Sequence, residues 1–377
     1  MAEMRTLTLV AGGGPAGSSC AWKLASAHIP CRVVEKQDFP RDKVCGGILS
    51  RRACSVLTGS GMVSAEELED LTLRKHSKIS FFHRGEFLRT YTSATHPVRV
   101  VSRKRFDSFL LDRARSAGAE VITGVKVESV DSRSAVTSTG EKMLFSHLVG
   151  ADGCTSVVRK LVSDRRSRKT GMGLEYLVPL SEMDRQPDGI EIHFGHLPYG
   201  YLWVIPGKDR ASVGAGAAGS PASPEDIVEA LGKFMDSLSI SRENHQLRGA
   251  SMPSLVLHGN LGRDNLYLVG DAAGLVDHIS GEGIGYAAES GFMAADCILA
   301  GDDRKSILRR DGNCIRMVRQ SILYRHLLFS RLTRGTAMIG LRDSVEFARG
   351  YWNIISGVET YNTMFSRILD LQGGTRA

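Results

Sequence analysis

Long apolar runs and paired cysteines are both missing from this chain of 377 residues. No uninterrupted apolar stretch approaches the roughly 18 residues that a helix needs to cross a bilayer, so we expect no transmembrane segment. The cysteines show no C-x-x-C pair and no His/Cys cluster with metal-ligand spacing; they stand at positions 20, 31, 45, 54, 154, 297 and 314. We therefore expect reduced thiols in a reducing compartment, and no metal site.

A secretion signal is missing too, because strand-like apolar residues begin almost at once. We therefore expect a cytoplasmic protein. The basic residues form no nucleic-acid-binding motif, which argues against nucleic acid as a partner. Much of the net charge of +7 lies in residues 301–350, where Lys and Arg outnumber Asp and Glu by about two to one. This segment predicts basic amphipathic helix, either packed on the body of the protein or in peripheral contact with an anionic membrane.

Glycines are plentiful, 41 in all, and they gather in motifs. The first motif, residues 12–17, reads GGGPAG; it follows an apolar run, and Glu35 closes the next apolar run. In a dinucleotide-binding crossover, Gly12 permits a tight turn, Gly14 lets a pyrophosphate approach, and Gly17 lets helix and strand pack closely. The helix N-terminus offers N–H groups to the phosphates, and the carboxylate accepts hydrogen bonds from a ribose. This pattern predicts a bound dinucleotide.

A second glycine-rich turn follows the apolar run 266–269. Asp271 comes directly after that run, where its carboxylate could bind the hydroxyls of a ribityl chain. Gly283 and Ile284 then open a long helix, whose N-terminus could stabilise negative charge on a reduced flavin. A third motif, Asp152-Gly153, lies between the other two. The three motifs, separated by strand-rich sequence, favour FAD over a nicotinamide alone.

In this order, G-x-G-x-x-G, D-G-x-x-S-x-x-R and G-D resemble the motifs of the hydroxylase-like flavoprotein superfamily. Two further segments are more specific. Residues 40–47, PRDKVCGG, resemble the P-R-x-K-x-C-G-G loop of the geranylgeranyl reductase family. Residues 198–206, PYGYLWVIP, are similar to that family's P-x-x-Y-x-W-x-F-P motif. Ile205 departs from it by replacing Phe, and this brings the segment close to the W-x-W-x-I-P motif of flavin-dependent halogenases.

The resemblance implies roles for matching positions. Tyr201 and Trp203, which share one strand face by their spacing of two, would bind the substrate. Cys45 would be the catalytic proton source or a gate, or else a structural residue packed against the flavin. The cofactor-binding positions would be Gly12, Gly14, Ala16, Gly17, Glu35, Cys45, Gly46, Arg103, Val127, Asp271, Gly283 and Ile284.

The predicted fold is α/β, a Rossmann-type FAD-binding domain with an inserted mixed or antiparallel sheet and a helical C-terminal segment. We expect the FAD-binding domain to be discontinuous, made of residues 1–75, 95–165 and 255–300. The strand-rich substrate domain would comprise residues 76–94 and 166–254. Residues 301–377 would form the helical segment.

The resemblance also implies the reaction. We expect a FAD-dependent reductase that saturates carbon–carbon double bonds of a prenyl lipid or similar apolar alkene by hydride transfer from flavin N5. The electron donor, NAD(P)H or a protein such as reduced ferredoxin, stays open. The first alternative is a monooxygenase or halogenase acting through a flavin hydroperoxide. The second is a flavin electron-transfer protein without an organic substrate.

Overall fold

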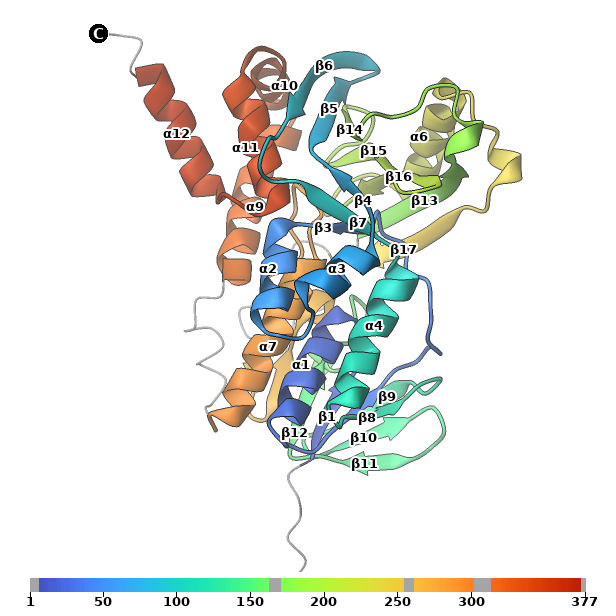
Figure 1. Ribbon diagram of the computed structural model, residues 1–377, viewed down its shortest axis with the longest axis vertical. Helices are drawn as coiled ribbons and strands as arrows, with labels where there is room; N and C mark the ends of the chain where they lie inside the picture. The colour runs from blue at the N-terminus through green and yellow to red at the C-terminus, as the bar shows by residue number, and fades with distance from the viewer. Residues whose placement is uncertain (1–6, 163–170, 254–260, 302–312, 374–377) are drawn as a thin grey trace, which may run out of the picture.

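The computed structural model describes residues 7–162, 171–253, 261–301 and 313–373. A six-stranded sheet lies in one half of the molecule and a seven-stranded sheet in the other (Figure 1). The C-terminal helices stand beside the seven-stranded sheet (Figure 1). This arrangement confirms the predicted fold class.

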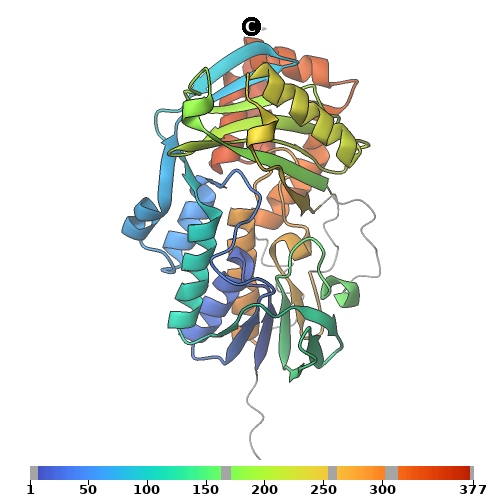
Figure 2. The ribbon, with the colours of Figure 1, turned by 90° about the vertical axis from the view of Figure 1, so that its right-hand side faces the viewer.

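The six-stranded sheet has the order β18-β19-β12-β1-β2-β8, and all its neighbours are parallel except β18 and β19. Parallel strands are buried on both faces, which explains the continuous apolar runs in the sequence. Helices α1 (Pro15–Ser26), α4 (Arg103–Ser116) and α7 (Ile284–Leu299) pack together on one side of it (Figure 2). Its strands are β1 (Thr8–Ala11), β2 (Cys31–Val34), β8 (Glu120–Ile122), β12 (His147–Gly150), β18 (Gly262–Arg263) and β19 (Leu266–Leu268).

Two glycines allow the backbones of α1 and α7 to come into direct contact with each other and with the turn before α1. A Cβ on Gly17 would lie 1.9 Å from the carbonyl oxygen of Gly12, and one on Gly291 would lie 2.2 Å from that of Ala16. Gly12 itself has a φ of +106°, which side chains rarely permit. As a result, the N-termini of α1 and α7 both lie at the edge where β1 and β19 end.

The seven-stranded sheet is mixed, with the order β17-β13-β16-β15-β14-β5-β6. One face, with Leu202 and Val213, packs against α6 (Pro224–Ser237). The other face, with Phe81 and Ile205, joins the core that includes the six-stranded sheet. The strands are β5 (Lys78–His83), β6 (Glu86–Thr92), β13 (Gly171–Pro179), β14 (Ile190–Phe194), β15 (Gly200–Pro206), β16 (Arg210–Ala217) and β17 (Arg248–Met252).

Smaller elements complete the body. Two three-stranded sheets consist of β3 (Ile48–Leu49), β4 (Thr72–His76) and β7 (Val98–Val101), and of β9 (Val127–Val130), β10 (Ser134–Thr137) and β11 (Lys142–Leu144). The short helices are α2 (Arg51–Gly59), α3 (Ala65–Leu71) and α5 (Arg159–Val162), and the 3-10 turns are η1 (Leu180–Glu182), η2 (Arg242–Asn244) and η3 (Gly270–Ala273).

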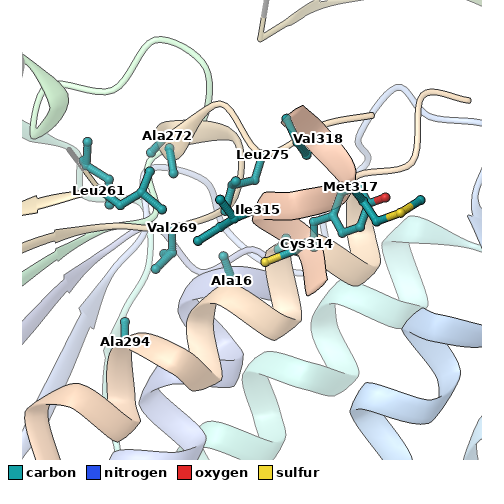
Figure 3. Close-up of a cluster of buried hydrophobic side chains, with 14 of the residues drawn as sticks. Ala16, Leu261, Val269, Ala272, Leu275, Ala294, Cys314, Ile315, Met317 and Val318 are labelled. Atoms are coloured by element: carbon teal, nitrogen blue, oxygen red, sulfur yellow. The ribbon is translucent and has the colours of Figure 1, made fainter. Parts of the chain in front are cut away.

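Four C-terminal helices extend the same core: α9 (Asn313–Phe329), α10 (Arg334–Asp343), α11 (Val345–Ser356) and α12 (Tyr361–Gly373). At the start of α9, Ile315 and Val318 pack near Leu275 and Ala16 (Figure 3). In α11, the ring of Tyr351 meets Phe81 edge-on, with centroids 5.1 Å apart. Within the described part of the chain, no helix combines the length and the apolar character needed to span a bilayer.

Candidate flavin and substrate site

The first glycine turn and Glu35 come together as predicted. Glu35 is buried, and its two carboxylate oxygens accept hydrogen bonds from the N–H groups of Gly13, at 2.7 Å, and Gln37, at 3.0 Å. Gly14 is the N-cap of α1, and no side chain caps this helix terminus. Ala16 and Gly17 lie in its first turn. The arrangement leaves this helix terminus available for an anionic group.

The second glycine-rich turn lies at the same edge. A Cβ on Gly283 would lie 3.9 Å from Oδ1 of Asp271, so the carboxylate stands beside the start of α7. Ile284 begins this helix, and no side chain caps its N-terminus either. The structure therefore brings together two uncapped helix N-termini, each accompanied by a carboxylate.

The structure places Val127 near Glu35 and Arg103 near Cys45. Val127 starts β9, and two residues earlier the N–H of Val125 donates to the Glu35 carbonyl at 3.0 Å. Arg103 is buried and donates two hydrogen bonds to Asp107, at 2.8 and 2.7 Å. Burial alone would lower the pKa of Arg103, but the Asp107 carboxylate outweighs it and raises that pKa. The guanidinium is thus held in one position.

We call residues 40–47 the Cys45 loop, and we call the edge where β1 and β19 end the nucleotide edge. The Cys45 loop connects the nucleotide edge to the seven-stranded sheet. The Lys43 ammonium lies 3.2 Å from Asp271. A Cβ on Gly46 would lie 2.4 Å from Cδ1 of Ile205. The Cys45 thiol accepts from the N–H of Gly47 at 3.4 Å, and its contact with Arg103 contributes to the raised pKa of that arginine. The loop therefore sets Cys45 between the two sheets.

Tyr201 and Trp203 share one face of β15, as their spacing predicts. The Tyr201 hydroxyl donates to the Ser280 carbonyl at 2.9 Å, and the two rings lie 6.1 Å apart. A Cβ on Gly214 would lie 2.3 Å from the Trp203 ring, so the indole occupies the space above this glycine. Both aromatic rings are thereby fixed near the loop that leads into α7.

The residues that fix Trp203 were not found from the sequence. Its ring N–H donates to Ser212 Oγ at 2.9 Å, and Ser212 donates to Glu175 at 2.8 Å. Burial raises the pKa of Glu175. Only the pairing of β13, β16 and β15 places these three residues side by side, and the sequence gives no local signal of it.

An apolar cavity of about 290 Å³ lies among the C-terminal helices, and sequence reasoning missed it as well. It reaches Ile279 and Ser280, in the loop before α7. Tyr351, which also lines it, packs against Phe194, whose ring lies 6.1 Å from that of Tyr201. The cavity therefore lies close to Tyr201 and Trp203, which we call the aromatic wall.

Glu282 is a further buried carboxyl, directly before Gly283. It accepts a hydrogen bond from the Ser50 hydroxyl, and Arg52 lies 3.9 Å away. Burial raises the pKa of Glu282 to about 7, against the opposing effect of Arg52. The start of α7 therefore carries a carboxyl that titrates near neutral pH.

These residues fit a bound FAD. The uncapped N-terminus of α1 at Gly14, where a Cβ would meet only the Arg41 guanidinium within 4 Å, suits a pyrophosphate, and Glu35 near it suits a ribose. Asp271 and the uncapped start of α7 suit the flavin end. The Cys45 loop, Tyr201 and Trp203 lie next to that end. The arrangement can bind a flavin nucleotide and present an apolar molecule to it.

Comparisons with known proteins support a bound FAD. The model of a family described as FAD binding domain matches residues 5–300. The chloroplastic geranylgeranyl diphosphate reductase of Oryza sativa is 30% identical over 397 residues, covering 96% of this chain and 76% of its own. The menaquinone reductase of Mycobacterium tuberculosis is 30% identical, covering 77% and 76%. A geranylgeranyl bacteriochlorophyll reductase-like structure from Thermoplasma acidophilum has a TM-score of 0.77 at 21% identity, covering 97% and 99%.

Replacing Glu35 with Ala should weaken FAD binding about tenfold to a hundredfold. A hydrogen bond to a charged group contributes about 1.5–3 kcal/mol, and each 1.4 kcal/mol is about a tenfold change. Titration of the FAD-free protein, followed by flavin fluorescence, measures the change. Glu141→Ala, at an exposed position, is the control and should bind FAD as the unmodified protein does. Equal affinities for all three proteins would contradict the assignment of Glu35.

Glu282→Gln should change how stability depends on pH. In the unfolded chain this carboxyl ionises near its ordinary value, whereas in the folded protein it keeps its proton up to about pH 7. Its contribution to the free energy of unfolding therefore falls as pH rises from about 4.5 to 7, by on the order of 3 kcal/mol.

The glutamine variant lacks this titration, so its stability relative to the unmodified protein should increase through the same window and stay constant above it. Urea unfolding of both FAD-saturated proteins between pH 4.5 and 8 measures the difference. Parallel stability curves across that range would show that Glu282 does not titrate there.

Proposed function

This chain belongs to the FAD binding domain family and is a FAD-dependent oxidoreductase of the geranylgeranyl reductase kind, and from this premise we propose that it saturates carbon–carbon double bonds in an apolar prenyl chain. The observation that carries the proposal is the cavity among α9 to α12, which is also lined by Ile279 and Ser280. A long apolar substrate needs such a space beside the flavin. Two of the relatives act, by their names, on geranylgeranyl diphosphate and menaquinone.

In this proposal each part of the chain has a distinct task. The predicted FAD-binding residues 1–75, 95–165 and 255–300 would hold FAD at the edge of the six-stranded sheet. The predicted substrate-domain residues 76–94 and 166–254 would supply the wall over the flavin ring. Of these ranges, residues 1–6, 163–170 and 254–260 lie outside the described part of the chain. The C-terminal helices enclose the chain of the substrate.

FAD, when bound and reduced, would supply a hydride from N5 to one carbon of the alkene. A residue of this chain would supply a proton to the other carbon, so that two C–H bonds replace the π bond. We assign the proton to the Cys45 thiol, because its loop stands between the nucleotide edge and Tyr201. Arg103 beside the sulfur can stabilise the thiolate that remains, which then regains a proton from water.

Tyr201 and Trp203 position the alkene. The polar atom of each ring already forms a hydrogen bond within the protein. The Tyr201 hydroxyl donates to the Ser280 carbonyl, and the Trp203 ring N–H donates to Ser212. The carbon surfaces of the rings are therefore the parts available to an apolar substrate. Fixed rings exclude water and hold the double bond in one orientation, which lowers the entropic part of the barrier.

The anaerobic reaction tests this function. Holoenzyme reduced with dithionite and mixed with geranylgeraniol or menaquinone, without oxygen, should yield a product with fewer double bonds, detected by mass spectrometry. Cys45→Ala should keep its FAD and react about 10²- to 10⁴-fold more slowly, the usual contribution of a general acid. Cys54→Ala, on α2, is the matched thiol control and should react at the unmodified rate.

One outcome would contradict the proposed reaction, and another would contradict the assigned proton source. Failure of the reduced enzyme to saturate either prenyl compound, together with oxygenated product in air, would identify a monooxygenase. An unchanged rate in Cys45→Ala would leave the reductase activity standing and remove the assigned proton source.

We also propose that the C-terminal helices contact an anionic bilayer. Apolar side chains are exposed here at Leu323, Leu332 and Ile339, with exposed fractions of 66%, 95% and 54%. Leu332 also lines the cavity, so its mouth lies at this surface. Arg319 and Arg331 add positive charge nearby. An apolar substrate could pass from the bilayer into the cavity without crossing water.

The protein should therefore sediment with phosphatidylglycerol-containing vesicles at low salt, and the double variant Leu332→Glu/Ile339→Glu should lose most of that binding. Leu144→Glu, at a position in β11 that is 62% exposed, is the control and should sediment normally. Absence of sedimentation at low salt, or equal binding by the double variant, would rule out this contact.

A further inference from the structure

Glu175, on β13, is a buried carboxyl with no part in the hydride or proton transfer proposed above. Its side chain is 1% exposed. Three donors converge on it: the Ser212 hydroxyl, 2.8 Å from Oε2, the Arg248 guanidinium, 3.7 Å from Oε1, and the backbone N–H of Cys45. A carboxylate is stable at such a depth only where donors and a cation replace its lost hydration.

The strand register places Glu175 and Trp203 on one face of the seven-stranded sheet. Glu175 lies opposite Gly214 of β16, and Gly214 lies opposite Trp203 of β15. Because Gly214 has no side chain, the Trp203 ring lies over it. Ser212, two residues earlier on β16, shares this face and joins the ring N–H to the carboxylate.

The chemistry of the groups fixes the direction of these hydrogen bonds. An indole N–H only donates, so Ser212 accepts from Trp203 and gives its single proton to Glu175. The backbone N–H of Cys45 also only donates. An ionised carboxylate can accept from both sides, because it has two acceptor oxygens and no proton. Glu175 is therefore the common acceptor for contacts that come from Trp203 and from Cys45.

Arg248 gives the Cys45 loop a second connection to the same carboxylate. Arg248 lies opposite Glu175 in the pair formed by β17 and β13. One of its guanidinium nitrogens lies 3.7 Å from Glu175, and another lies 3.9 Å from Asp42, in the Cys45 loop. Glu175 thus contacts the loop directly at Cys45 and through this arginine at Asp42.

We propose that Glu175 is a positioning residue that holds the Cys45 thiol and the Trp203 ring in one fixed geometry. This inference rests on the proposed function, which assigns the proton to Cys45 and the orientation of the alkene to the aromatic wall. A proton donor and a ring that orients the substrate must be placed relative to each other, because small errors of position slow a reaction strongly. One carboxylate that accepts from both sides supplies that relation.

Nuclear magnetic resonance of the holoenzyme, labelled with ¹⁵N in cysteine and tryptophan, tests this link without catalysis. Cys45→Ala and Trp203→Phe identify the Cys45 amide signal and the Trp203 ring N–H signal. As pH falls, both signals of the unmodified protein should shift with one shared midpoint, because protonation of Glu175 places a proton among groups that only donate. Burial raises the pKa of Glu175, so this midpoint should lie above the ordinary value for glutamate.

Arg248 and Asp42 are the other charged groups that face Glu175 among the described residues. Arginine keeps its charge throughout such a titration. Asp42→Asn should keep the shared midpoint, since its exposed carboxylate contacts Arg248 and not the two reporting groups. Loss of the shared midpoint in Asp42→Asn would assign the titration to Asp42 and overturn the proposal.

Glu175→Gln should remove the titration of both signals and shift both at neutral pH, because its amide brings a donor against donors. Glu191→Gln is the matched control. Glu191 is also a buried carboxylate of this sheet, 2% exposed, but it pairs with Arg185 and His193, so both signals should stay in place. Titration of either signal that persists in Glu175→Gln, or two different midpoints in the unmodified protein, would overturn the proposal.

Ser212→Ala provides a second test if Glu175→Gln does not fold. It cuts the path from the carboxylate to Trp203 and leaves the contact with Cys45. The Trp203 signal should then stop titrating, while the Cys45 signal keeps its midpoint. A Trp203 signal that still titrates together with Cys45 would contradict the path through Ser212.

Kinetics test the consequence for the reaction. In a single turnover of reduced holoenzyme with saturating geranylgeraniol, Glu175→Gln should react about tenfold to a hundredfold more slowly. Its solvent isotope effect should be larger, because proton delivery from a displaced Cys45 limits the rate more strongly. Glu191→Gln should keep both the rate and the isotope effect.

An unchanged rate and isotope effect in Glu175→Gln would contradict a positioning role. If the unmodified enzyme reduces no prenyl compound, the proposed function fails, and the titration of the two signals still decides whether Glu175 links Cys45 to Trp203.

Discussion

The close backbone contact between α1, β1 and α7 is the constraint on which the rest of the structure depends. With no side chain at Gly17 and Gly291, the two helices lie against each other and against the turn at Gly12. Both N-termini then point toward one edge of the six-stranded sheet. Two positive helix ends at a single edge suit a ligand with a pyrophosphate at one part and a flavin ring at another.

The Cys45 loop connects this edge of the sheet to the residues of the proposed reaction. It contacts Asp271 through Lys43 and the seven-stranded sheet through Gly46 and Ile205. The same loop therefore borders both the flavin end of the nucleotide edge and the aromatic wall. The position of Cys45 relative to Tyr201 follows from contacts that also define the cofactor site, so binding and reaction geometry are linked.

Buried charge near the Cys45 loop is paired. Among the described residues, the carboxylate of Asp107 receives both Arg103 and Arg41. Such pairs hold the side chains in position and leave the aromatic wall as the surface that faces an apolar substrate.

Most of the sequence-based predictions of site residues rested on patterns among residues that are close together in the sequence. The glycine turn and Glu35 were recognisable because neighbouring residues in sequence form them, and Tyr201 and Trp203 because a strand alternates its faces. Glu175 and Ser212 were missed, since only strand pairing brings them to Trp203. The cavity depends on how four helices pack, and helical periodicity shows an apolar face without identifying its neighbours.

The most direct test of the account is a crystal structure of the FAD-bound protein with a saturated prenyl compound. The account predicts that the chain lies among α9 to α12 and passes Ser280, with its end between the flavin ring and Tyr201. A chain bound elsewhere, with no part of it among these helices, would contradict the proposed path of the substrate.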